Sequence, residues 1–386
     1  PVAAIYGANA SGKTNVISAL EFVKKAVESS QREWKPDGPI PRQPFLLDDE
    51  SSRASPSEFV VDTIVQGIRY QYGFAVTDKA VTEEWLNAYP NGKKQAWFSR
   101  KSGKPITFSS KMGGENRTIE ALTRPNSLFL SAAAQNNHES LTPIYKWFSD
   151  RLFFVTSSRS AYRFLTVALC KQANDKIRIS ELLRIADLGI DDLSLKEENV
   201  PGLLETIHLS TKGISPEEFV SRLSVTITEP SFDFELLHHG ENGPVPFPMT
   251  QESQGTIAYL SMLGPLLQAM DQGGVICIDE LDASLHPLVA IQIIKIFNHS
   301  TGNKAGAQLI FNTHDVNLLS YGMRRDQIWF TEKGRDGASQ LYPLTDFKPR
   351  MGENIHNGYL QGRYGAIPFL NSDSFMAAVE AADEKE

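Results

Sequence analysis

The sequence predicts an α/β fold that is interrupted by a long insertion. Residues 2–6 form an apolar run that leads into a glycine-rich loop and then into a helical pattern. A second apolar run, at 274–278, opens a stretch in which helix-length and strand-length patterns alternate as far as residue 331. Between these parts the chain shows strand-like alternation and then helical patterns. We therefore expect an α/β frame with an antiparallel β subdomain and an inserted, mainly helical lobe.

Length and composition indicate a globular protein with more than one lobe. The chain has 386 residues, against roughly 150 for an ordinary single domain. Hydrophobic residues make up 41% and charged residues 22%, which supplies enough apolar material for a sizeable core. The net charge is −8, from 38 basic and 46 acidic residues. That balance disfavours a polycation that coats nucleic acid, although it is compatible with a local basic groove.

Cysteine content and hydropathy bear on location. The two cysteines, Cys170 and Cys277, form no CxxC pair. We therefore expect neither a disulfide scaffold nor a structural zinc site, and a cytoplasmic location fits. No run of about 18 apolar residues occurs, so no membrane-spanning segment is expected. The first residue, Pro1, leads almost at once into a strand-like run, and we expect an N-terminal piece to precede it.

The patterns divide the chain into three segments. Residues 1–80 hold the first strand, the loop, a helix and alternating strands; residues 81–225 hold hairpin turns and then helical patterns; residues 226–386 return to α/β alternation. No repeat or heptad run is present, so any arm is short. In the last segment we expect helices at 255–270 and 287–298 and strands at 274–278, 307–311 and 327–331.

The loop after the first strand has the composition of a phosphate-binding loop. Residues 7–14 read Gly-Ala-Asn-Ala-Ser-Gly-Lys-Thr, which matches GxxxxGK[ST] between a predicted strand and a predicted helix. Glycines let backbone N–H groups wrap phosphate oxygens, and the following helix directs its positive N-terminal end at them. In this motif Lys13 reaches the outer phosphates of ATP and the Thr14 hydroxyl binds Mg²⁺.

Two acids follow the apolar run at 275–278. A short buried strand of this kind delivers carboxylates to the C-terminal edge of a parallel sheet, where α/β folds bind ligands. We expect Asp279 to hold the magnesium ion and Glu280 to orient or deprotonate the attacking water. An apolar run followed by two acids also ends ordinary strands, and it is the pairing with the phosphate loop that makes the pattern specific. Asp279 lies 266 residues after Lys13 (279 minus 13), so a large insertion splits the site.

These motifs resemble the ABC-type ATPase heads of the SMC, Rad50 and RecF group. Asn9 and Asn15 fit that group's GxNxSGK[ST]N loop, and residues 280–287 resemble the exit of its Walker B strand and its D-loop. Residues 312–315, Asn-Thr-His-Asp, are similar to its switch-histidine strand end. Residues 252–256, Glu-Ser-Gln-Gly-Thr, stand in the place of the signature motif. They depart from the transporter sequence LSGGQ, which argues against a transporter subunit.

More narrowly, the chain resembles the AAA15/AAA21 class of ABC ATPases of bacterial anti-phage and abortive-infection systems, which includes RloA, AbiLi and the PARIS ATPase. The stretches that carry this resemblance are 252–256, 278–287, 308–315, 325–330 and 358–368. It covers both ends of the chain well and the middle thinly. The ATPase motifs are specific, whereas the assignment to one defence system is not.

The resemblance implies roles for particular residues. Two ATP molecules would be sandwiched between two subunits, so that the chain forms a homo-oligomer. Glu280 and His314 would be catalytic, Ser253 and Gly255 would reach the ATP of the other subunit, and Asp282 would cross the interface. Gln43 would be the Q-loop glutamine at the metal, beside Thr14 and Asp279. The implied nucleotide-binding residues of the first loop are Gly7, Asn9, Ala10, Ser11, Gly12, Lys13, Thr14 and Asn15.

The implied function is an ATP-dependent switch of anti-phage defence. Its partner would be a separate effector, a TOPRIM-type or RloB-like nuclease, and its trigger a nucleic acid or a phage protein. The alternative is a RecF- or Rad50-like repair or recombination ATPase that acts on DNA directly. A gene neighbour encoding a nuclease would favour the first, and a recombination neighbour the second.

Three weaker signals lie outside the ATPase motifs. The basic segment 93–104 with interleaved aromatics is typical either of a solvated strand pair or of a nucleic-acid contact. His238 and its neighbour His239 are interpreted as strand surface. Arg363 and Tyr364 indicate either packing or partner docking.

Overall fold

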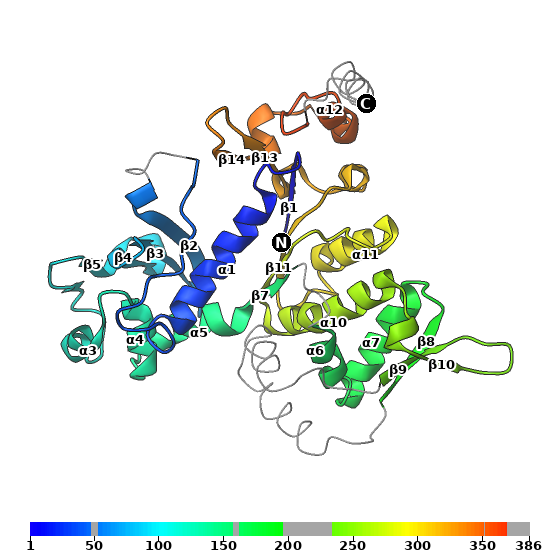
Figure 1. Cartoon of the computed structure of the whole chain (residues 1–386), viewed down its shortest axis with the longest axis horizontal. Helices are drawn as coiled ribbons and strands as arrows, with labels where there is room; N and C mark the ends of the chain where they lie inside the picture. Colours follow the sequence, from blue (N-terminus) through cyan, green and yellow to red (C-terminus); the bar gives the residue numbers. More distant parts are fainter. Residues whose placement is uncertain (48–52, 157–161, 196–233, 351, 369–386) are drawn as a thin grey trace, which may run out of the picture.

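A six-stranded, mostly parallel sheet forms the centre of the molecule (Figure 1). The computed structural model describes residues 1–47, 53–156, 162–195, 234–350 and 352–368. In spatial order the strands of the central sheet are β14 (Ser339–Pro343), β13 (Ile328–Lys333), β1 (Val2–Gly7), β12 (Gln308–Asn312), β11 (Val275–Ile278) and β7 (Leu152–Val155).

The first strand lies inside this sheet, between two strands from the far end of the chain. β1 pairs in parallel with β12, with Val2 opposite Leu309, and with β13, with Ala4 opposite Ile328. β11 pairs in parallel with β12 and with β7, and β14 closes the other edge antiparallel to β13. The parallel strands are buried on both faces, which explains why β1 and β11 are continuous apolar runs rather than alternating ones.

One face of the central sheet is covered by α1 and an antiparallel β subdomain. The helix α1 (Lys13–Ser29) packs its buried side chains, among them Ile17 and Val23, against this subdomain. In Figure 1 the helix runs between the central sheet and the subdomain. The subdomain consists of β2 (Ser57–Val65), β3 (Ile68–Val76), β4 (Val81–Tyr89), β5 (Gln95–Lys101), β6 (Thr107–Phe108), α3 (Asn116–Leu122), α4 (Phe129–Gln135) and α5 (Thr142–Arg151).

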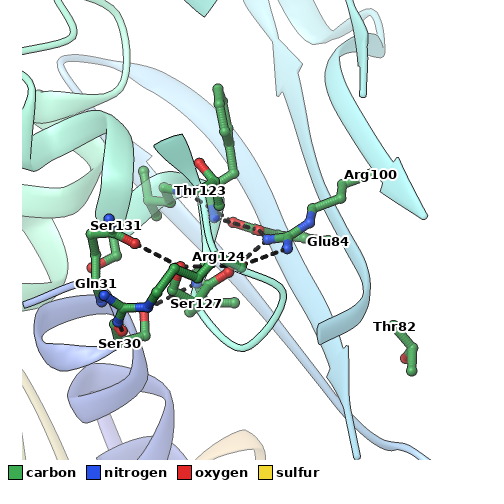
Figure 2. Close-up of polar contacts among 12 residues, drawn as sticks. Ser30, Gln31, Thr82, Glu84, Arg100, Thr123, Arg124, Ser127 and Ser131 are labelled. Carbon is green, nitrogen blue, oxygen red and sulfur yellow. Dashed lines mark hydrogen bonds and ion pairs between the residues drawn. The ribbon is translucent and has the colours of Figure 1, made fainter. Parts of the chain in front are cut away.

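A buried ion pair joins the sheet of the β subdomain to its helix α4 (Figure 2). Glu84 is fully buried and accepts hydrogen bonds from the backbone N–H groups of Phe129 and Leu130, at 2.6 and 3.0 Å, at the start of α4. Arg100 lies opposite Glu84 in register, 3.3 Å away, and also donates to the Ser127 carbonyl at 2.6 Å. Arg100 therefore has a structural role. Because its guanidinium is buried, it cannot contribute to a nucleic-acid contact by segment 93–104.

The same network reaches the end of α1 (Figure 2). Arg124 donates to the carbonyls of Ser30 and Trp34, at 2.7 and 3.0 Å, just beyond the last turn of α1. Ser127 donates to the side chain of Gln31 at 2.6 Å. Charged donors on the last carbonyls of a helix satisfy groups that have no partner within the helix. The end of α1 that is remote from the phosphate loop is thus fixed to the β subdomain.

Helices and a small sheet cover the opposite face of the central sheet. The longest of the described helices, α10 (Gln254–Gln272), is buried along its middle, and α11 (Pro287–Asn298) packs into the same core. The Thr166 hydroxyl donates to the Leu260 carbonyl at 2.7 Å and accepts from the Gly264 N–H at 2.9 Å. This face also holds α6 (Tyr162–Leu169), α7 (Ala173–Ile185), and the sheet of β8 (Ile190–Leu195), β9 (Phe234–His238) and β10 (Val245–Pro248).

The C-terminal described segment packs on β13 and β14. The helix α12 (Ile355–Leu360) places Tyr359 parallel to Phe330, with ring centroids 5.4 Å apart. Tyr364 is buried and donates to Glu353 at 2.7 Å, and Arg363 forms an ion pair with the same carboxylate at 2.6 Å. Of the two interpretations of this tail, intramolecular packing accounts for both residues.

The structure confirms the expected strands and helices of the last segment. The sheets, however, extend across the segment borders that were expected at residues 80 and 225. The border at residue 80 falls between β3 and β4, which are neighbours in one sheet. β7 lies inside the expected insertion 81–225, yet it pairs with β11 in the central sheet. The insertion is therefore not a separate body. The part of it at 196–225 lies outside the described residues. Among the helices that the structure describes, none has both the length and the apolarity of a membrane span.

Candidate functional site

The phosphate loop leaves β1 at Gly7 and enters α1 at Lys13. Gly12, just before the helix, has φ 104°, a left-handed conformation that favours glycine. Gly7 lies so close to Thr331 on β13 that a Cβ atom there would overlap the threonine side chain. The Ser11 hydroxyl lies 2.7 Å from the Thr331 hydroxyl, which ties the loop to β13. Both glycines of the motif are thus required by local geometry.

The Lys13 amine lies inside the loop. It is buried and donates to the carbonyls of Gly7 at 2.8 Å and Ala8 at 3.1 Å. Burial lowers the pKa of Lys13, and the nearby carboxylates Glu280 and Asp282 oppose that shift. The lysine therefore occupies the centre of the loop with acids nearby, as the motif requires.

The first acid after β11 meets the loop directly. The Thr14 hydroxyl donates to Asp279 Oδ1 at 3.0 Å, although the two residues are 265 positions apart. Asn312, at the end of β12, donates to the same oxygen at 2.5 Å. Asp279 and Asn312 are buried at the C-terminal edge of the parallel strands. Hydroxyl and carboxylate oxygens are the ligands that Mg²⁺ prefers, so this pair fits the expected metal.

The second acid lies at the mouth of the site. Glu280 has φ 52°, and its backbone N–H donates to the Asn312 side-chain oxygen at 2.5 Å. His314 places Nε2 3.9 Å from Glu280 Oε1, and the two side chains are 44% and 45% exposed. The carboxylate and the imidazole are therefore accessible to water or to a ligand, while the backbone beneath them is fixed.

Asp282 connects two loops: the loop after β11, the strand that precedes the acids Asp279 and Glu280 and is called the acid strand here, and the loop after β12 that holds His314. Its carboxylate accepts from the backbone N–H of His314, with both oxygens at 3.3 Å. The Leu281 N–H donates to the Asn312 carbonyl at 3.1 Å. The loops after β11 and β12 are thus joined by backbone contacts as well as by side chains.

The proposed signature residues lie at the N-terminus of α10. Ser253 is the N-cap, and its hydroxyl accepts from the Thr256 N–H at 3.0 Å. Gly255 lies against the backbone of Ser284, such that a Cβ on Gly255 would come within 2.6 Å of the Ser284 carbonyl oxygen. Ser284 has φ 63° in the loop after β11. The signature segment and the loop that holds Asp282 therefore adjoin within one chain.

Among the residues that the structure describes, three other members of the predicted site form no polar contact with it. Asn9 and Asn15 are exposed on the loop and on the first turn of α1. Gln43 is also exposed, and it makes no hydrogen bond with any residue in the described part of the chain. Its assignment as a metal ligand therefore stays a prediction. Ala10 is exposed on the same loop, with φ 60°.

The donors of the loop fit a nucleotide phosphate. α1 has no side-chain cap at its N-terminus, so its first N–H groups are available to an anion. The Lys13 amine adds a positive charge at the same place. Lys13, Thr14 and Asp279 would hold the phosphates and a magnesium ion between them.

Sequence comparison assigns the family. The AAA_21 family model, described as "AAA domain, putative AbiEii toxin, Type IV TA system", matches residues 2–320. The chain belongs to this family. No curated protein sequence matches it. Together with the mostly parallel central sheet, family membership confirms the predicted α/β fold with an AAA-type nucleotide-binding domain.

The solved structures that match this chain are distant from it in sequence. An SMC head bound to the C-terminal winged-helix domain of ScpA has 15% identity and TM-score 0.36, over 88% of this chain and 89% of that chain. An SMC head from Pyrococcus furiosus with an extended coiled coil, bound to the C-terminal domain of ScpA, has 15% identity and TM-score 0.33, over 89% and 91%. The ATP-binding cassette MJ0796, dimeric with ADP and phosphate, has 15% identity and TM-score 0.24, over 69% and 75%.

Sequence reasoning missed the role of one residue at the centre of the site. Asn312 was part of the quoted Asn-Thr-His-Asp stretch but was not assigned a function. In the structure its amide contacts both Asp279 and the backbone of Glu280. A polar side chain at the end of a buried strand, next to the acid strand, was the available signal.

Proposed function

We propose that the chain binds and hydrolyses ATP with Mg²⁺ and acts as a switch. The observation that supports this best is the contact of Thr14 with Asp279, because it joins the phosphate loop to the acid strand across the whole insertion. Mg²⁺ would supply charge neutralisation at the outer phosphates. The Lys13 amine would bind those phosphates in place of the Gly7 carbonyl that it now contacts.

Glu280 and His314 would complete the catalytic machinery. The Glu280 carboxylate is exposed beside the buried Asp279, which suits a group that accepts a proton from water. His314 would donate a hydrogen bond to the outermost phosphate. Because Asp282 accepts a hydrogen bond from the backbone N–H of His314, a shift of the loop after β11 would displace His314 as well.

Homo-oligomerisation would complete the site. Ser253 and Gly255, which the resemblance assigns to a partner's ATP, adjoin the loop that holds Asp282, which it assigns to the interface, so these residues share one surface of the chain. In this arrangement two chains would enclose two ATP molecules. ATP binding would then drive association of the two chains, and ATP hydrolysis would allow them to separate.

The biological role that we propose is control of a separate toxic effector in anti-phage defence. The family description, a putative AbiEii toxin of a type IV toxin–antitoxin system, supports a role in regulated toxicity. The effector would be a nuclease of the TOPRIM or RloB-like kind, supplied as another chain. Direct action on DNA, as in repair ATPases, is the competing proposal.

The catalytic assignment is tested by two variants that act on different steps. Glu280→Gln should keep ATP binding and lower hydrolysis by about 10²–10⁴-fold, because the amide retains hydrogen bonds but cannot act as a base. Lys13→Ala should weaken binding itself. Equilibrium binding of a fluorescent ATP analogue, run beside phosphate release, separates the two. Full turnover by Glu280→Gln would refute the role of this carboxylate.

The biological assignment is tested by incubating the purified chain with ATP, Mg²⁺ or Mn²⁺, and plasmid, linear DNA or tRNA. We expect ATP hydrolysis without cleavage of any nucleic acid. Cleavage that disappears in a variant of this chain's own acids would show that the nuclease is not separate. ATP turnover stimulated strongly by DNA alone would favour the repair alternative.

A further inference from the structure

A unit beside the central sheet contacts α10 near both of its ends. We use the name α7–β10 unit for α7 with the β8–β9–β10 sheet, residues 173–195 and 234–248. Toward the C-terminal end of α10, Arg178 forms two hydrogen bonds with Asp271, at 2.8 and 2.9 Å. Within the helix, the Tyr259 hydroxyl donates to a carbonyl of α7 at 3.1 Å. These contacts hold the body of α10 on the unit.

The third contact lies directly before the N-terminus of α10. His238, the last residue of β9, places Nε2 2.7 Å from Glu252 Oε1. The Glu252 side chain is only 3% exposed. A buried carboxylate is costly unless a donor reaches it, so the histidine stabilises the buried position of Glu252. Removing the imidazole would leave that carboxylate without its donor.

The His238 ring is itself held by the small sheet. It lies against the Phe247 ring, with centroids 4.5 Å apart. His238 is in register with Val245 on β10 and Ile190 on β8. The ring therefore moves with the sheet, and the sequence interpretation of His238 as strand surface is replaced by a structural contact.

Glu252 is the residue before Ser253, whose hydroxyl caps α10, and Gly255 touches the loop of Ser284. We propose that His238 is a positioning residue that acts through Glu252 on the signature segment, residues 252–256. Through this contact the α7–β10 unit and the signature segment move as one body. The inference rests on the proposed function only in assigning Ser253 to the ATP of a partner subunit.

The next residue supplies a matched control. The side chain of His239 is 82% exposed and lies 3.2 Å from Asp191. His239→Ala therefore removes an equal group from the adjacent position of the same strand end. His238→Gln is the conservative variant, because its amide nitrogen can donate from nearly the position of Nε2.

The first measurement needs no nucleotide and no activity. Hydrogen–deuterium exchange of the peptide that covers residues 250–260 should be about 10-fold faster in His238→Ala than in the wild type, since a lost hydrogen bond to a charged group weakens local closure. His239→Ala should leave the exchange unchanged, and His238→Gln should restore most of the protection. Equal exchange in His238→Ala and the wild type would overturn the inference, as would equal acceleration by His239→Ala.

The second measurement separates positioning from general stability. In His238→Ala we expect kcat for ATP to fall about 10-fold with the Kd for ATP within about 2-fold of the wild type, because the signature segment acts only after ATP is bound. His238→Gln should recover kcat. A parallel loss of ATP affinity, or no recovery with glutamine, would overturn the positioning role. Absence of hydrolysis by the wild type would instead refute the proposed function, and the exchange experiment would still decide this inference.

Discussion

Replacing Asn312 by alanine should impair both stability and catalysis. The side chain is fully buried and bridges two parts of the site. Its nitrogen donates to Asp279 Oδ1 and its oxygen accepts from the Glu280 N–H, both at 2.5 Å. Alanine removes both bonds at once and leaves a buried carboxylate oxygen and a backbone N–H with one partner fewer.

The magnitude follows from these two bonds. A hydrogen bond to a charged group contributes about 1.5–3 kcal/mol and a neutral one about 0.5–1.5 kcal/mol. We therefore expect Asn312→Ala to lower the free energy of unfolding by about 2–4 kcal/mol. Glu280 has φ 52°, an unfavourable conformation for a residue with a side chain, and the bond from its N–H helps to hold it. Loss of that bond should displace the carboxylate, and a displacement of about 1 Å can lower the rate about 10²-fold.

Chemical denaturation and phosphate release measure the two effects separately. The matched control is Asn303→Ala. Asn303 is also buried, and its side chain bonds to Phe297 and Ala307 between α11 and β12. This control should cost similar stability but leave kcat unchanged. The reasoning fails if Asn312→Ala unfolds within about 0.5 kcal/mol of the wild type, a surface-like effect, or if both variants lose activity equally.

Two further predictions concern assembly and pH. Mixing inactive Ser253→Arg with inactive Lys13→Ala should restore some hydrolysis, because one mixed site is intact; no recovery despite proven subunit exchange would indicate a site within one chain. Hydrogen bonds from Tyr364, the Arg350 N–H and Arg363 lower the pKa of Glu353 to about 2. A depressed carboxyl pKa contributes its full stabilisation above the ordinary value and loses it as the pH falls to the depressed value. The difference in Tm between wild type and Glu353→Gln should therefore be full at neutral pH and shrink from about pH 4.5 toward pH 2. An unchanged difference at pH 2 would contradict it.

The phosphate loop and the acid strand could be predicted because each is a contiguous motif. The order of residues in the loop dictates the backbone that wraps a phosphate, and an apolar run before Asp279 dictates a buried strand. Their contact through Thr14 followed from the chemistry that the two motifs share. None of this required knowledge of how distant strands pair.

The parts that were missed depend on pairing between distant strands. β7 is four buried residues directly after α5, with no turn residue between them, so its sequence was grouped with the helical patterns. Arg100 looked like a surface cation until the register placed Glu84 opposite it. Asn312 acquires its role only because β12 lies beside β11. Register is a property of the assembled sheet, and no local pattern encodes it.

The position of β1 has a consequence for synthesis of the protein. This strand is made long before its two neighbours, β12 and β13, which lie about 300 residues later in the chain, with Val2 opposite Leu309. The ribosome must therefore release the chain as far as β13 before β1 can enter its sheet. Until then the backbone edges of β1 are unpaired and its apolar side chains are exposed to solvent. Such a state is prone to aggregation and is a target for chaperones. A prematurely terminated chain that lacks β11, β12 and β13 could not assemble the candidate site around Asp279 and Asn312, so only a chain made past these strands could carry the proposed activity.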